Sequence, residues 1–179
     1  MKLTKEEIIG ILENAFTYIV VFAMFAYGAG KIIQFNGAFE IDKSVSELTG
    51  MQLMWAFYGY SKPFVITLGV LEMLGGTLLL LKRTRLIGCL LVTSILVNVI
   101  LQDIFYSVNV GALKAAIIYQ LLIVVILWFN RVRLIQCIKI LTSYEKIAES
   151  KKMYFTRIIL SVLLFALLRV LEFYITIRW

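Results

Sequence analysis

Five long apolar blocks constrain this chain more than any other feature of its sequence. Each block approaches the roughly 20 apolar residues that an α-helix needs to cross the hydrocarbon core of a bilayer. Because 61% of the residues are hydrophobic and only 16% are charged, the chain lacks the polar surface of a soluble domain. We therefore predict an all-α, multi-pass membrane protein that forms a single transmembrane domain over residues 1–179. The predicted spans are 11–33, 64–81, 86–105, 112–129 and 158–177.

Two segments between the spans are amphipathic, at about 45–60 and 131–152. Before the first of them, Ser44 and Glu47 have the spacing of a capping box, in which the two side chains bond to free amides at a helix start. Apolar residues recur at helical spacing after that box, and again along the second segment. Both segments are too polar or too short to span, so we predict helices that lie along the membrane surface.

The distribution of Lys and Arg in the loops predicts the orientation of the chain. Basic residues accumulate after the second span, at Lys82, Arg83 and Arg85, and again over 131–157. Loops with an excess of Lys and Arg face the cytoplasm. The start of the chain is mixed in charge and has no Ala-x-Ala cleavage site, so the first span is expected to stay as an anchor. We predict a protein of the cytoplasmic (inner) membrane with a cytoplasmic N-terminus and an external C-terminus.

Two predicted spans contain ionisable residues at mid-depth. Glu72 lies in the second span, and Arg169 and Glu172 lie in the fifth. A charge in hydrocarbon costs at least a few kcal/mol, so such residues are candidates for function. With a rise of about 1.5 Å per residue, Glu72 and Arg169 each lie about 12–13 Å below the outer end of their spans. We therefore predict that they form an ion pair, while Arg169 and Glu172 can also pair within their own helix.

Further polar residues fall near the same predicted outer end, and they suggest a pocket that opens outward. Glu72, Arg169 and Glu172 would form the floor of this pocket. Its mouth would hold the further polar residues, which are Lys31, Gln34, Gln102, Asp103 and Lys114. Other readings remain open: the buried charges can fasten helices to one another or carry protons, and the mouth residues can extend to the interface or lie in solvated loops.

The residues that are missing exclude several classes of function. The chain has no histidine, which removes the commonest zinc ligand and the usual general base. Its two cysteines, Cys89 and Cys137, lack the C-x-x-C spacing of a redox pair. The basic residues flank apolar blocks and form no stripe suited to nucleic acid. We predict no catalytic residue, no metal, no cofactor and no nucleic-acid partner.

The central part of the chain resembles the DoxX-like family of small integral membrane proteins. The most specific part is Gly-x-x-Glu-x-x-Gly-Gly, from Gly69 through Glu72 to Gly76, followed by Arg83-Thr84. Supporting segments are Gly30-Lys31, Gln34-Phe35, Leu53 to Ser61, and Tyr106 to Val110 leading to Lys114. The resemblance covers about residues 25–130. It implies a four-helix bundle, to which the fifth span would be an addition, and links to membrane redox complexes or to the assembly of other membrane proteins.

These observations favour a non-enzymatic role. We expect an accessory or assembly protein in the lipid bilayer that binds a lipid, a quinone-like molecule or a partner membrane protein through its outward polar pocket. One alternative is a membrane subunit of a quinone-linked redox complex whose cofactor resides in a partner. Another is a proton-coupled transporter of small molecules, in which Glu72 would titrate.

Overall fold

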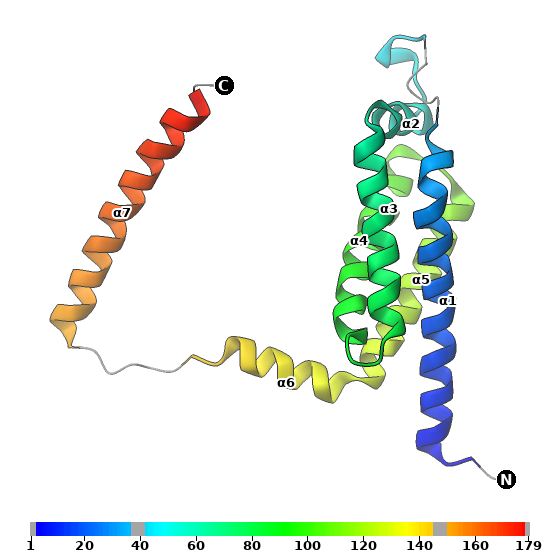
Figure 1. Ribbon diagram of the computed structural model, residues 1–179, viewed down its shortest axis with the longest axis horizontal. Coiled ribbons are helices and arrows are strands. Elements are labelled where there is room, and N and C mark those ends of the chain that lie inside the picture. The colour runs from blue at the N-terminus through cyan, green and yellow to red at the C-terminus, as the bar shows by residue number, and fades with distance from the viewer. Residues whose placement is uncertain (1–2, 37–41, 145–149, 178–179) are drawn as a thin grey trace. The chain divides into compact units, whose positions relative to one another are not determined.

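The structure is a computed structural model that describes residues 3–36, 42–144 and 150–177. All regular secondary structure in these ranges is helical (Figure 1). The prediction of an all-α chain is confirmed for the described residues. The helices are α1 (Lys5–Gln34), the short 3-10 helix η1 (Val45–Glu47), α2 (Gly50–Tyr60), α3 (Lys62–Leu80), α4 (Arg85–Tyr106), α5 (Val110–Phe129), α6 (Arg131–Thr142) and α7 (Lys151–Ile177).

Five of these helices are long and apolar enough to cross a membrane, as the sequence predicted. They are Lys5–Lys31, Lys62–Leu80, Arg85–Tyr106, Val110–Phe129 and Lys151–Ile177. The protein is therefore a multi-pass membrane protein. The first helix begins at Lys5 and not near residue 11, because Thr4 and Glu7 form a capping box that starts it earlier.

The chain divides into two compact units, residues 1–138 and 139–179. In the first unit α1 packs against α3 and α5, α3 against α4, and α4 against α5, so that four helices surround one core. The helix α2 packs on α3 and α4 at one end of this bundle (Figure 1), which we name the α2 end. The opposite end, where α1 begins, is the N-terminal end. The second unit contains α7.

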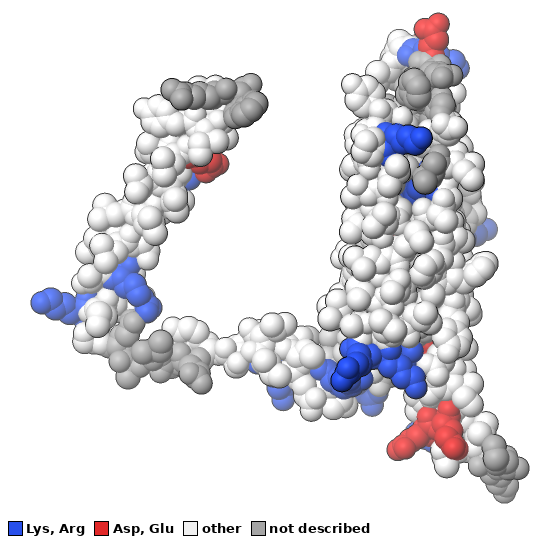
Figure 2. All heavy atoms as spheres, in the orientation of Figure 1, with Lys and Arg blue, Asp and Glu red and all other residues white. Residues whose placement is uncertain are grey.

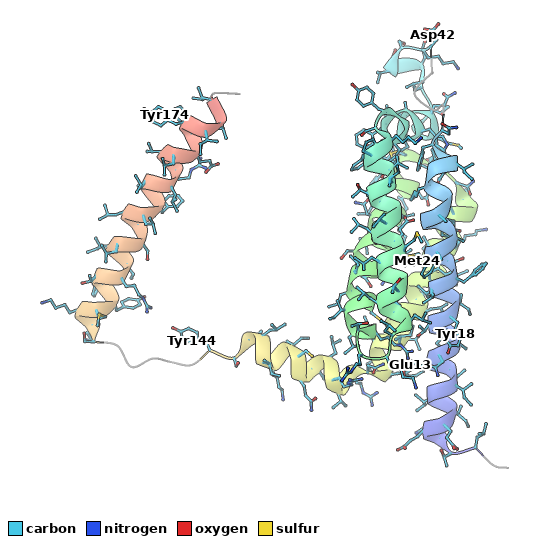
Figure 3. All side chains as sticks on the ribbon, in the orientation of Figure 1. Glu13, Tyr18, Met24, Asp42, Tyr144 and Tyr174 are labelled. Atoms are coloured by element: carbon cyan, nitrogen blue, oxygen red, sulfur yellow. The ribbon has the colours of Figure 1, made fainter. Side chains whose placement is uncertain are left out.

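The core of the first unit is small and apolar. Its fully buried side chains include Val20, Leu79, Val92, Ile123 and Ile126. Met24 of α1 lies against α3 (Figure 3). Large apolar side chains also cover the outside, and the middle of the visible face of the bundle carries few charges (Figure 2). An apolar exterior is stable only in lipid, which confirms the membrane assignment from packing.

The helices α1 and α3 approach each other closely at one pair of glycines. A Cβ atom built on Gly28 would lie 2.7 Å from the carbonyl oxygen of Gly69, and one built on Gly69 would lie 2.5 Å from the carbonyl oxygen of Gly28. Only glycine allows this backbone contact, which small residues commonly provide between membrane helices. Gly30, by contrast, faces open space.

The first amphipathic segment forms two short helices where the sequence predicted one. The backbone amide of Ser44 bonds to the Glu47 carboxylate at 3.3 Å, as the capping-box spacing predicted, but the helix that it opens ends at Glu47. A second box formed by Thr49 and Gln52 starts α2. Each box supplies its own helix start, so the chain turns between them.

Over the second amphipathic segment, α6 ends at Thr142 and α7 already begins at Lys151. Residues 145–149 lie outside the described residues.

Candidate functional site

A cavity of about 840 Å³ lies under the α2 end of the bundle. Side chains from α1, α2, α3, α4 and α5 line it, so the whole first unit shapes it. The volume is that of sites which enclose small organic ligands. Its polar side chains include Lys31, Gln34, Glu72, Asn98, Gln102 and Asp103, and its aromatic ones are Tyr27, Phe35, Trp55, Phe57, Tyr58, Phe64 and Tyr119.

Five of the residues predicted for the pocket lie around this cavity. Those that line it are Lys31, Gln34, Glu72, Gln102 and Asp103. Lys114 lies exposed on α5 and is not part of the lining. Arg169 and Glu172 belong to α7 in the second unit, where they form the ion pair predicted for i,i+3 neighbours.

Glu72 forms an ion pair with Lys31. The Nζ of Lys31 lies 3.2 Å from Oε1 of Glu72, and their side chains are only 14% and 6% exposed. The sequence analysis placed Lys31 at the mouth of the pocket and predicted Arg169 as the ion-pair partner of Glu72. In the first unit the carboxylate thus has a cation from α1, three residues after Gly28, whereas pairing with Arg169 would join the two units and stays a prediction.

Two buried carboxylate oxygens in the cavity have no hydrogen-bond partner within the described part of the chain. Among the described residues, nothing donates a hydrogen bond to Oε2 of Glu72 or to Oδ2 of Asp103. The two residues are 4% and 8% exposed. A buried polar atom without a hydrogen bond carries a desolvation cost of about 1–3 kcal/mol, and more if it is charged. Such atoms in a cavity are the acceptors that a ligand or water would meet.

Tyr58 links the wall of the cavity formed by α2 to α4. Its phenol donates a hydrogen bond of 2.9 Å to the side-chain oxygen of Gln102, and the Gln102 amide donates in turn to Asn98. Burial is the main cause that raises the pKa of Tyr58, opposed by the bond to Gln102 and assisted by the nearby Glu72 charge. The phenol therefore stays protonated at neutral pH and acts as a donor.

Aromatic rings form the roof of the cavity where α1 meets α2. The ring of Phe35 lies 5.0 Å from that of Trp55 and 4.9 Å from that of Tyr58, measured between centroids. The Lys31 ammonium also lies 5.6 Å from the centroid of Phe35. Rings at these separations contribute more than their buried area alone, and their faces attract cations.

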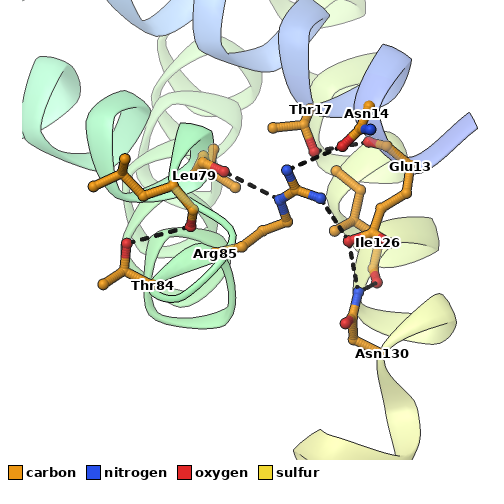
Figure 4. Close-up of polar contacts among 9 residues, drawn as sticks. Glu13, Asn14, Thr17, Leu79, Thr84, Arg85, Ile126 and Asn130 are labelled. Atoms are coloured by element: carbon orange, nitrogen blue, oxygen red, sulfur yellow. Dashed lines mark hydrogen bonds and ion pairs between the residues drawn. The ribbon is translucent and has the colours of Figure 1, made fainter. Parts of the chain in front are cut away.

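A second buried ion pair joins the helices at the N-terminal end, and sequence reasoning missed it (Figure 4). Arg85 Nη1 lies 2.8 Å from Oε1 of Glu13. The guanidinium also donates to Asn14 and to the carbonyl of Leu79, and Asn130 donates to the same Glu13 oxygen. The contacts connect α1, α4 and α5 with the last turn of α3.

The sequence analysis placed Arg85 in the basic loop between the second and third spans, and the structure corrects this. Arg85 is the first residue of α4 and only 6% exposed. The signal for this site was Glu13, an acid inside the first predicted span that has no partner within its own block. A smaller cavity of about 160 Å³ adjoins the pair, beside Lys82 and Arg133.

In the described parts of the chain, no three His, Cys, Asp or Glu side chains gather closely enough to hold a metal ion. Cys89 is buried in the core and Cys137 is exposed on α6, and both are free thiols.

The fold and the cavity define a class of protein: a multi-pass helical membrane protein whose bundle encloses, at one end, a largely apolar cavity with a few polar groups. The chain is 30% identical over 123 residues to the uncharacterized protein YwoB of Bacillus subtilis (strain 168), a match that covers 67% of this chain and 77% of YwoB. It belongs to the same family as YwoB. No family model matches the chain, and no solved structure matches it.

Proposed function

We propose that this protein binds an amphiphilic small molecule, a lipid or a quinone-like compound, in the cavity under the α2 end, and that it acts without catalysis as an accessory membrane protein. The observation that supports this most is the combination of about 840 Å³ of space with buried, unpaired acceptor atoms on Glu72 and Asp103. Charged residues that only held the helices together would need no such space. Their polar atoms would also form hydrogen bonds with one another.

The surroundings of the cavity suit an amphiphile. Apolar and aromatic side chains dominate the lining, and a few polar groups gather between them, as in sites that fix the head of a ligand and bury its body. The cavity lies within a bundle that is apolar outside. A molecule dissolved in the bilayer therefore reaches it without crossing water.

The proposal includes the predicted orientation, with the α2 end outside the cytoplasm. Its support is the basic character of the opposite end, where Lys82, Arg83, Arg131 and Arg133 lie exposed around the ends of α3 and α5. An Asp42→Cys variant in a Cys89→Ala background tests it. An impermeant maleimide applied to intact spheroplasts should label the thiol introduced at position 42 and leave Cys137 unlabelled, and labelling of Cys137 alone would reverse the orientation.

We also propose that the protein is DoxX-like. The support is that Glu72, the central residue of the Gly-x-x-Glu-x-x-Gly-Gly segment, lines the cavity together with Lys31 and Gln34, which belong to the other segments of the resemblance.

The second candidate binding partner of this protein is another membrane protein. The described part of α7 is long and apolar, and we propose it as the helix that such a partner contacts.

Ligand binding is tested by filling the cavity from α5. Ala112 is half-buried and lines the cavity, so Ala112→Trp should exclude a bound amphiphile. Ile118→Trp is the matched control, since Ile118 is 54% exposed on the same helix and is not part of the lining. The full chain is purified in mild detergent, and co-purifying molecules are identified by native mass spectrometry.

We expect one class of small amphiphile on the wild type and on Ile118→Trp, and its loss from Ala112→Trp. Retention on all three proteins would show that the molecules adhere to the outer surface. Specific recovery of one membrane protein with no small molecule would favour the partner role.

A further inference from the structure

The charges that line the cavity do not balance. Among the described residues in its lining, the charged ones are Glu72, Asp103 and Lys31. Two carboxylates against one ammonium leave one negative charge. Lys31 is committed to Glu72 at 3.2 Å, whereas Asp103, which is only 8% exposed, forms no ion pair within the described ranges.

The unsatisfied atoms are all of one kind. Oε2 of Glu72 and Oδ2 of Asp103 are acceptors, and neither receives a hydrogen bond from a described residue. An ionised carboxylate accepts and cannot donate. The missing part of the site is therefore a donor, and a donor that also carries positive charge restores the balance. Hydrogen bonds between charged partners are about twice as strong as neutral ones.

The aromatic rings around these acids suit the same ligand. Tyr27 and Tyr119 lie 6.4 Å apart between centroids, and Trp55 and Tyr58 of α2 also line the cavity. The negative face of an aromatic ring attracts an ammonium group, and it also packs against an alkyl chain. Rings beside buried carboxylates are a poor environment for an anionic head group, which would meet like charge.

Building on the proposed function, we propose that the occupant is an amphiphile whose head group is a protonated amine, which donates a hydrogen bond to Asp103 while its apolar tail lies against the aromatic side chains of the cavity. An oxidised quinone offers only acceptors to the Asp103 carboxylate. A fatty acid offers a second anion. The cavity therefore discriminates against both of these among the molecules that the bilayer dissolves.

The test compares probes of equal chain length on the full protein in phosphatidylcholine nanodiscs. Radiolabelled dodecylamine is bound and then competed with dodecanol or dodecanoate, and empty nanodiscs give the partition into lipid. We expect dodecylamine to bind about tenfold more tightly than dodecanol, the amount that one charge-assisted hydrogen bond provides, and dodecanoate to compete least.

The variant Asp103→Asn should weaken dodecylamine about tenfold and change dodecanol little. Asp42→Asn is the charge-matched control, because Asp42 is exposed and is not part of the cavity lining. Asp103→Asn removes a buried unpaired charge, so it is expected to fold at least as well as the wild type. The melting temperature of each variant verifies this, and Glu72→Gln provides a second acid variant.

The possible failures are distinguishable. If dodecanoate or decylubiquinone binds as tightly as dodecylamine, and is excluded by Ala112→Trp, the cavity binds amphiphiles and the preference for an amine is wrong. If no probe binds beyond the empty nanodiscs, the proposed function itself is wrong. Equal loss of dodecylamine binding in Asp103→Asn and Asp42→Asn would trace the affinity to net charge and overturn the role of Asp103.

Discussion

Lys31 and Glu72 meet across the contact between α1 and α3, with 3.2 Å between Nζ and Oε1. Each follows by three residues a glycine of the Gly28–Gly69 contact, and because α1 and α3 run in opposite directions (Figure 1), the ion pair spans the closest backbone approach. The glycines bring the helices together, and the pair fixes their register. This arrangement holds the acid at the cavity wall and gives it a cation on one side only.

We expect the loss of one partner of the Lys31–Glu72 ion pair to destabilise the protein more than the replacement of both partners. Lys31→Met leaves the Glu72 carboxylate buried without a cation, so the free energy of unfolding should fall by about 3–5 kcal/mol. The double variant Lys31→Met, Glu72→Leu should recover most of this loss, because no buried charge remains. Denaturant unfolding in detergent measures both, with Lys114→Met on the exposed side of α5 as control. Additive losses in the double variant would contradict the pairing.

The backbone contact predicts opposite effects for two glycines of α1. Gly28→Ala places a Cβ about 2.7 Å from a carbonyl oxygen of α3, so the helices must separate and the protein should lose about 1–3 kcal/mol of stability. Gly30→Ala meets open space and should gain up to about 1 kcal/mol from helix propensity. Melting temperatures of the two variants check this, and equal destabilisation would show that the contact is absent.

The second ion pair, between Arg85 and Glu13, is expected to hold the helices together at the N-terminal end of the bundle. Arg85→Ala leaves Glu13 with Asn130 but without its cation, and should destabilise the bundle by about 3–5 kcal/mol. Adding Glu13→Gln should restore part of the loss. Arg83→Ala is the matched control, because Arg83 is exposed two residues away and should change stability by no more than about 0.5 kcal/mol. If folded Arg85→Ala protein still binds the ligand, the cluster around Arg85 stabilises the bundle and has no part in ligand binding.

Tyr58 predicts a loss of stability at high pH. Its pKa is raised from the ordinary 10.0, mainly by burial, so the native state binds the phenolic proton more tightly than the unfolded state. The stability that this provides is fully present below pH 10 and is lost as the pH rises toward the native pKa. Tyr58→Phe should cost about 1 kcal/mol at neutral pH through the bond to Gln102, and the gap to wild type should narrow above pH 10. Unfolding series at several pH values measure it, and a constant gap would contradict the prediction.

The helices and their membrane character could be predicted from local sequence alone. Hydrophobic length and capping residues are local properties, so all five spans appear, and Glu72 is recognisable as a charge inside a span. Four further polar residues of the cavity were also found, because Lys31, Gln34, Gln102 and Asp103 all lie at the same end of their helices. Alternation of the spans across the bilayer brings those ends to one level.

Which charges meet within the bundle depends on the packing of its helices. Depth along a helix follows from residue count, but the direction of a side chain around the bundle axis does not, so residue count could not show that Glu72 pairs with Lys31 beside the Gly28–Gly69 contact. In the same way, Arg85 belongs to a basic turn by sequence and to the bundle interior by packing. A basic residue at a helix end can extend to the interface or turn inward, and the position of Glu13 on the neighbouring helix decides between them.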